Sequence, residues 1–347
     1  MTSKAPNKKQ STTPPAIVQF FHTGKEFHVK GGKNAISVEA PWNSARRSNR
    51  KKTQSASCLI KPSNVNHGSC GGCHDGQEDV EWVSNHYRRL VVHKGEYIDK
   101  NGNLISGNLA FWTEWEACTI ASCMPRTNDP TGARWFHNVV SPLGKSGAKR
   151  INTDPCVFGS TFKYCCCLQH RENERGKDGI MLRNLPKGSV IMFGSKFLNP
   201  NAFILDTIFV VGSIRIPYFE GDKPSIQVSD EYRELALRRF FNNERPNTFY
   251  RGVSYQDTHG TSPFSFVPAR RFLQTNPSCG KRFVLDLAKI NKALKETSER
   301  FEPNSKQTQG FHSIIVSAVT AEAVWREIVR QVQAAGFVLG VHFDWPK

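Results

Sequence analysis

The sequence predicts an α+β protein built on a mixed, mainly antiparallel twisted sheet or partial barrel with peripheral helices. Three observations predict this class: a hairpin signal, two apolar runs rich in β-branched residues, and helical periods that do not alternate regularly with strands. No internal repeat of about 20 to 50 residues is visible. A doubly wound sheet and a repeat protein are therefore both disfavoured.

The strands are indicated by turns and by apolar runs. Residues 81–109 alternate between polar and apolar side chains and contain Asn101-Gly102, the strongest short hairpin signal. Residues 189–194 and 203–211 predict two adjacent buried strands, and residues 337–343 predict a final strand.

Three helices are predicted, over residues 229–241, 285–300 and 321–335. Ser229 and Thr320 can cap the first and the last of them, and Gly336 ends the last. The last helix carries one apolar stripe, which is typical of core packing. The stripe consists of Val324, Trp325, Ile328, Val329 and Val332.

The charge pattern divides the chain into two parts. The 347 residues include 47 Lys and Arg against 30 Asp and Glu, a net charge of +17. Residues 1–60 alone hold 11 of the basic and 2 of the acidic residues. We expect a basic, partly disordered arm over residues 1–65 and a single decorated domain for catalysis or base recognition over residues 66–347. The surplus predicts a polyanionic partner, and DNA is the leading expectation.

Neither a membrane-spanning segment nor an export signal is apparent, which predicts a cytoplasmic protein without a membrane partner. Ten cysteines in such a chain indicate free thiols or metal ligands. Cys70, Cys73 and His74 have the spacing of half a zinc site, so a structural zinc ion is possible. The alternative is a glycine-rich turn with free thiols. No cofactor is expected to be required for catalysis.

Residues 112–116 read WTEWE and combine carboxylates with aromatic rings. Glu114 and Glu116 are candidate catalytic carboxylates, and Trp112 and Trp115 are candidates to stack on a nucleobase. The alternative is an edge strand whose acids pair with arginines.

Residues 152–155 read NTDP and lie between a basic and an aromatic stretch. Asp154 is the first candidate to stabilise a cation-like sugar during N-glycosidic hydrolysis, and Asn152 could orient it or bind the base. Tyr164 is a further stacking candidate, and Asp206 could bind the base or replace Asp154. The alternative for Asp154 is an ordinary turn before proline.

Basic residues in several stretches could hold the DNA backbone, with solvated loops as the alternative. These are Arg46, Arg47, Lys149, Arg150 and Arg251.

Three stretches together resemble a family of uncharacterised bacterial proteins. They are residues 112–116, the NTDPCVFG sequence at residues 152–159, and the LDTIFVV sequence at residues 205–211. The resemblance covers about residues 81–347, and it links the chain to phage-defence DNA glycosylases that remove glucosylated hydroxymethylcytosine. It implies base flipping and cleavage of a modified cytosine from phage DNA as an antiviral activity.

Two shorter resemblances concern other readers of bases. Thr153-Asp154-Pro155 and Ser141-Pro142-Leu143 are similar to elements of uracil-DNA glycosylases, but here they occur in the reverse order. Residues 187–211 resemble the barrel hairpin of PUA- and ASCH-type domains, which read modified bases.

Three alternative functions remain at this point. One is an RNA-binding structural protein, which would show no preference for DNA. A non-enzymatic reader of modified nucleic acid would use the same basic surface and pocket. An ADP-ribosyltransferase would use Arg251 and Ser265, which resemble the Arg and Ser strand motifs of that family, although its Glu-x-Glu element is not visible.

Overall fold

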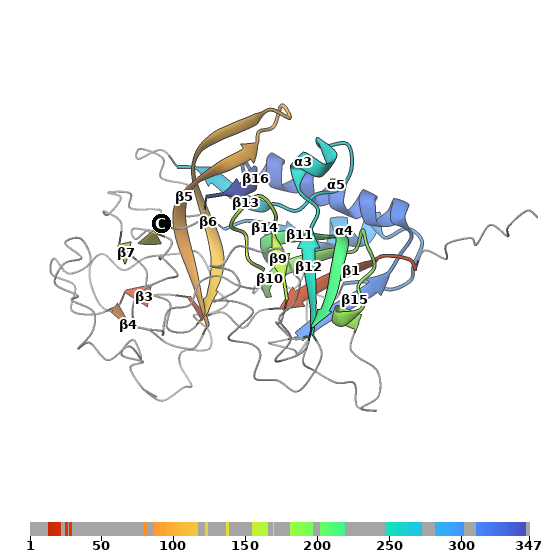
Figure 1. Cartoon of the computed structure of the whole chain (residues 1–347). Helices are drawn as coiled ribbons and strands as arrows, with labels where there is room; N and C mark the ends of the chain where they lie inside the picture. Colours follow the sequence, from red (N-terminus) through yellow and green to blue (C-terminus); the bar gives the residue numbers. More distant parts are fainter. Residues whose placement is uncertain are drawn as a thin grey trace, which may run out of the picture.

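The computed structural model is an α+β fold dominated by strands, as the sequence predicts (Figure 1). It describes residues 13–21, 25–26, 28–29, 80–81, 86–116, 122–123, 137–138, 155–165, 169, 181–196, 202–218, 247–272, 282–301 and 310–344. Within these segments, none of the helices is both long and apolar enough to cross a membrane.

The first sheet contains the two adjacent apolar strands predicted from the sequence. They are β10 (Val190–Lys196) and β11 (Ala202–Tyr218), which pair antiparallel. The sheet order is β15 (Gly310–Ile315), β1 (Ala16–Phe21), β10, β11, β12 (Asn247–Gly252) and β9 (Lys163–Tyr164), with β14 (Val284–Asp286) also paired to β11. Because β1 runs parallel to β10, the sheet is mixed.

Strand β1 corrects the expected domain boundary. All six of its residues are buried, and it lies between β10 and β15 inside the first sheet. The expected arm over residues 1–65 therefore includes a core strand, because a strand that is apolar at five of its six positions is stabilised by burial on both faces.

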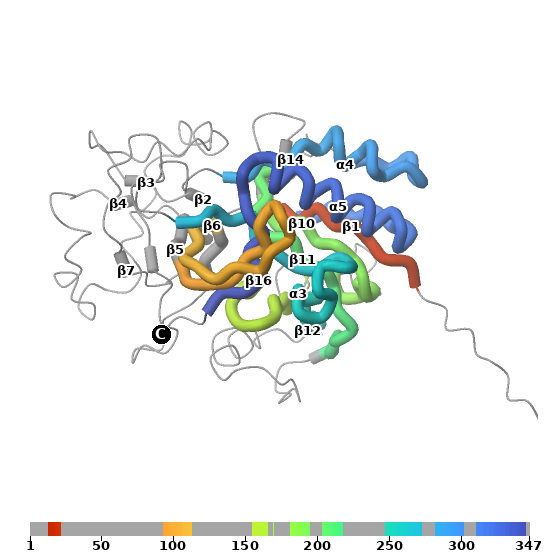
Figure 2. The backbone as a smooth tube through the Cα atoms, turned by 90° about the horizontal axis from the view of Figure 1, so that it is seen from above, coloured from red at the N-terminus to blue at the C-terminus, as the bar shows by residue number. Residues whose placement is uncertain are grey.

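Each face of the first sheet is covered. Along β1, Val18 and Phe20 join one buried cluster while Ile17 and Phe21 join the other, as strand alternation requires. The second cluster includes apolar residues of α4 (Leu287–Ala293) and α5 (Ala318–Ala334). Figure 2 shows these two helices side by side.

The caps set the helix bounds. Ser317 caps α5, three residues before the predicted Thr320, because its hydroxyl accepts from the Thr320 amide. Asp286 caps α4, so the predicted helix over residues 285–300 is shortened by β14 at its start, and it ends at Ala293 with Leu294 as its C-cap. The expected helix over residues 229–241 lies outside the described residues. The described residues also include two short helices, η4 (Met181–Arg183) and α3 (Tyr255–Thr258).

The second sheet contains the predicted hairpin. Its strands β5 (His86–Ile98) and β6 (Leu104–Glu116) are joined by a turn in which Asp99 Oδ1 accepts from the amides of Asn101 and Asn103. Gly102 has φ of 83°, which a side chain would disfavour.

Four strands of the second sheet form a closed ring. Strand β13 (Val267–Arg271) pairs with β6 and with β16 (Val338–Phe343), and β16 pairs back to β5. This agrees with the expected partial barrel and final strand. Short strands β2 (Lys25–Glu26), β7 (Ser122–Cys123) and β8 (His137–Asn138) extend the sheet, and β3 (His28–Val29) pairs with β4 (Val80–Glu81).

The two sheets meet where β11 approaches the start of β13. The Ile208 amide donates to the Phe266 carbonyl at 2.8 Å, and the Phe266 amide donates to the Ile208 carbonyl at 2.9 Å. Side chains from both sheets therefore converge beside residue 208.

Candidate functional site

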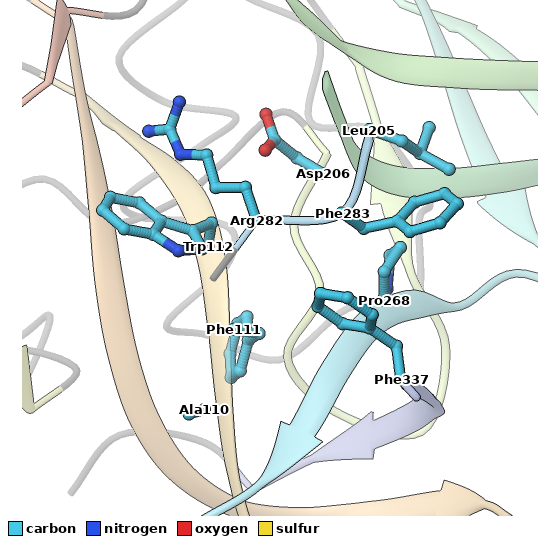
Figure 3. A pocket seen from close by; sticks show the side chains of 9 residues that line it. All are labelled: Ala110, Phe111, Trp112, Leu205, Asp206, Pro268, Arg282, Phe283 and Phe337. Carbon is cyan, nitrogen blue, oxygen red and sulfur yellow. The ribbon is translucent and has the colours of Figure 1, made fainter. Parts of the chain in front are cut away.

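A pocket lies at this junction and is lined by side chains from both sheets (Figure 3). Trp112 comes from β6, Asp206 from β11, and Arg282 from the short segment before β14. The complete lining is Ala110, Phe111, Trp112, Leu205, Asp206, Pro268, Arg282, Phe283 and Phe337. Trp112 and Asp206, two of the residues predicted to bind a base, are thus brought together across 94 positions of sequence.

A β-bulge positions Asp206. Phe193 of β10 pairs with Thr207, but the next residue, Gly194, pairs with Leu205, so Asp206 is the extra residue of β11. A bulge re-aims a side chain and is frequent beside active sites.

Strand β10, which pairs with β11 at this bulge, has a glycine where the two backbones come close. A Cβ on Gly194 would lie 2.0 Å from the Ile204 carbonyl oxygen, so only glycine fits there. The strand's inward positions change phase at the bulge, because Leu205 before it and Ile208 after it both join the helix-covered cluster. Asp206 is consequently directed to the pocket while its neighbours remain in the core.

Arg282 covers one face of the Trp112 ring. Its Cζ lies 4.2 Å from the ring centroid, a cation–π contact, and both side chains are buried. The backbone of Phe283, the residue after Arg282, is held in place because the Leu205 amide donates to the Phe283 carbonyl at 3.1 Å. Arg282 was not among the predicted site residues, because the basic pair Lys281-Arg282 before a short strand carries no spacing signal in the sequence.

The pocket is polar at one end and apolar at the other. In Figure 3 the Asp206 carboxylate and the Arg282 guanidinium lie at the same end, away from the rings of Phe111 and Phe337. The cavity volume is about 10 Å³, which is room for roughly one water molecule. The arrangement offers an aromatic face, a hydrogen-bond acceptor and a cation around a space that is nearly filled.

Tyr164 does not belong to this site, which corrects the prediction that it stacks on a base. Its ring is fully buried and stacks on Tyr250, with centroids 5.8 Å apart and planes at 10°. The rings of Phe20 and Phe193 contact it as well. A tyrosine in the middle of this cluster stabilises the core and offers no face to a ligand.

Tyr250 is held by the backbone of η4 and the residues after it. Its hydroxyl donates to the Leu182 carbonyl and accepts from the Leu185 amide. Burial raises the pKa of Tyr250 to about 12, so the hydroxyl keeps its proton and its role in the core.

Arg251 lies in β12, partly exposed, and its register partner is Lys163 of β9. Lys163 is a buried cation whose Nζ donates to the carbonyls of Phe158 and Thr161. Burial lowers the pKa of Lys163, Arg251 lowers it further, and Cys156 raises it. Partly exposed, Arg251 remains a candidate phosphate contact, whereas Lys163 is engaged with its own loop.

Ser265 is buried, and its side chain is hydrogen-bonded to the backbone of Val210. Its hydroxyl accepts from the Val210 amide at 2.9 Å and lies 2.7 Å from the position of a Cβ on Gly252. This packing favours a structural role, so the geometry lends no support to the ADP-ribosyltransferase alternative.

The other predicted residues cannot be placed. Glu114, Trp115 and Glu116 belong to β6, but only their backbone is described. The remainder lie outside the described residues: Arg46, Arg47, Cys70, Cys73, His74, Lys149, Arg150, Asn152 and Asp154. Within the part of the chain that the structure describes, no group of three or more His, Cys, Asp or Glu side chains could hold a metal ion.

Comparison with family models, with curated proteins and with solved structures finds no match to this chain.

Proposed function

We propose that this protein is a cytoplasmic DNA glycosylase that excises a modified cytosine, such as a glucosylated one in phage DNA, as antiviral defence. The observation that carries the proposal is the pocket in which a β-bulge directs Asp206 toward Trp112 and Arg282. An extruded base is recognised by an aromatic face together with hydrogen bonds to its polar edge, and this pocket contains both elements.

The charge balance supports DNA as the partner. The described residues hold 20 of the 47 Lys and Arg and 14 of the 30 Asp and Glu, so most of the surplus belongs to the other segments. Arg251 would contribute to backbone binding together with Arg46, Arg47, Lys149 and Arg150, since phosphate contacts position a protein on DNA without reading its sequence.

In this proposal two carboxylates have different tasks. Asp206 accepts a hydrogen bond from the amino group of the base, as carboxylates do at cytosine N4. Asp154, with Asn152 beside it in the sequence, stabilises the positive charge that develops on the sugar as the C1′–N bond breaks. Water adds to C1′, and the base leaves with a proton, so the products are a free base and an abasic site.

The test is mass spectrometry of bases released when the full chain is incubated with DNA containing cytosine, 5-hydroxymethylcytosine or its glucosylated form. We expect a free modified base and an equal number of alkali-labile sites. Tight binding to modified DNA with no released base would instead assign a non-enzymatic reader. Absence of both binding and release would refute the proposal.

The Asp154→Ala variant separates catalysis from binding. We expect DNA binding to persist and base release to fall by about 10³-fold or more, the scale for a group that stabilises transition-state charge. Glu322→Ala, which removes a partly exposed carboxylate of α5, is the matched control and should leave release unchanged. Equal rates for wild type and Asp154→Ala would remove Asp154 from the mechanism.

A further inference from the structure

Access to the pocket between Trp112, Asp206 and Arg282 is limited by the size of the pocket. A cavity volume of about 10 Å³ contrasts with the roughly 300 to 1,000 Å³ of ordinary ligand pockets. A nucleobase can therefore enter only if a lining side chain moves away.

Arg282 is the side chain best placed to move. The residues around it in β6, β11 and β13 belong to strand ladders, whereas Arg282 precedes β14 and is attached by a flexible stem. The neighbouring Phe283 carbonyl is held by the Leu205 amide, so the backbone can stay in place while the side chain of Arg282 turns.

The position of Arg282 also matches that of a ligand. A guanidinium is planar, and its Cζ lies 4.2 Å from the centroid of the Trp112 ring. A stacked nucleobase would occupy the same side of the same ring. Asp206 borders this place and would accept a hydrogen bond from an amino group on the edge of the base.

We propose that Arg282 closes the pocket by occupying the base position on Trp112, and that an amino-bearing nucleobase displaces it. The inference rests on the proposed function insofar as the pocket takes a base. Once displaced, the guanidinium is available to a phosphate of the same nucleotide, so the side chain that closes the pocket also contributes to binding the DNA backbone.

The experiment measures binding of 2′-deoxycytidine and thymidine to the full chain by calorimetry. We expect Arg282→Ala to bind 2′-deoxycytidine about tenfold more tightly than wild type, because a desolvated cation–π contact no longer competes. The affinity for thymidine, which lacks the amino group, should increase much less in this variant. Adding Asp206→Asn to Arg282→Ala should abolish the preference between the two nucleosides.

Arg282→Leu is the matched control. Leucine also removes the charge but keeps an apolar side chain against Trp112. This variant should therefore bind 2′-deoxycytidine no more tightly than wild type. Equal gains for Arg282→Ala and Arg282→Leu, or no gain for Arg282→Ala while it keeps the wild-type circular dichroism spectrum, would overturn the inference.

A second measurement uses the wild-type protein and does not depend on the folding of a variant. Phenylglyoxal modifies accessible arginines, and peptide mass spectrometry reports the reaction at each site. Excess 2′-deoxycytidine should increase modification of Arg282 and leave that of the exposed Arg326 unchanged. Unchanged or decreased modification of Arg282 would refute its displacement.

The inference and the proposed function can fail separately. Base release from DNA by wild type, without a gain in Arg282→Ala, would support the glycosylase and reject Arg282 as the closing residue. A gain in nucleoside binding with no base release would support the closed pocket and reject the enzyme.

Discussion

Two buried cations, Lys163 and Arg282, are held in contrasting ways. Each side chain belongs to a residue that is 8% exposed. The Lys163 ammonium donates to the carbonyls of Phe158 and Thr161 at 3.1 and 2.8 Å. The Arg282 guanidinium instead lies over the face of Trp112 beside Asp206.

In our proposal this difference separates a structural group, Lys163, from an exchangeable one, Arg282. Backbone carbonyls stay where the fold puts them, so the partners of Lys163 lose their hydrogen bonds if the ammonium leaves. An aromatic face has no such requirement, because another planar group can replace the guanidinium with similar contact. Burial of a charge alone therefore does not identify a functional residue, and the proposal for Arg282 rests on the ring that its guanidinium contacts.

The largest expected change in stability is that caused by Lys163→Met. Methionine keeps the apolar stem but leaves the Phe158 and Thr161 carbonyls without the ammonium, and relief of the buried charge offsets only part of this loss. We expect the free energy of unfolding to fall by about 2 kcal/mol in urea denaturation. Lys187→Met, at an exposed lysine, is the control. A Lys163→Met protein as stable as wild type would remove the contrast between the two cations.

The pH dependence of stability provides a further check on Lys163. Burial lowers its pKa from the ordinary value of 10.5. Between the lowered pKa and 10.5 the unfolded chain still binds a proton that the folded chain has lost, so this residue makes the free energy of unfolding rise with pH. Below that window the buried charge makes its full unfavourable contribution.

We therefore expect wild type to gain stability relative to Lys163→Met as the pH is raised through that window toward 10.5. Urea midpoints of both proteins over a pH series measure the difference. A constant or shrinking difference would show that the folded state does not disfavour the charged form.

The sequence predicted the strands better than the helix bounds. Residues 189–194 and 203–211 carry apolar side chains on both faces, apart from Ser189, Asp206 and Thr207, and both faces are indeed covered. The predicted helix over residues 285–300 was too long because β14 occupies its first residues, where pairing with β11 overrides helical periodicity.

The candidate site was predictable only in part. Trp112 and Asp206 follow from residue type, but the bulge that directs Asp206 depends on Gly194 and on register, which short-range patterns do not reveal. Tyr164 shows the opposite failure. Its aromatic type fits base stacking, yet neighbours distant in sequence, such as Phe20 and Tyr250, enclose it.

A smaller effect is expected from the coupling between Arg282 and Trp112. In a double-mutant cycle with Arg282→Met and Trp112→Leu, we expect a coupling free energy of about 1 kcal/mol, the size of a partly desolvated cation–π contact. Urea denaturation of the wild type and the three variants measures it. Additive losses would mean that the two side chains are merely adjacent, and the contrast with Lys163 would then concern burial alone.

The smallest effect is expected at an exposed cation, Arg330 of α5. Its guanidinium donates to both carboxylate oxygens of Glu327 at 2.7 and 2.8 Å, but its side chain is 58% exposed. In Arg330→Ala, Glu327 retains the hydrogen bond from Gln331 Nε2 at 3.0 Å, and water solvates the rest. Exposed ion pairs of this kind contribute little to stability, so we expect the urea midpoint to stay at the wild-type value. A loss as large as that of Lys163→Met would show that removal of any cation destabilises the fold. The nature of the partner, carbonyl or aromatic ring, would then not be what determines the cost of removing a cation.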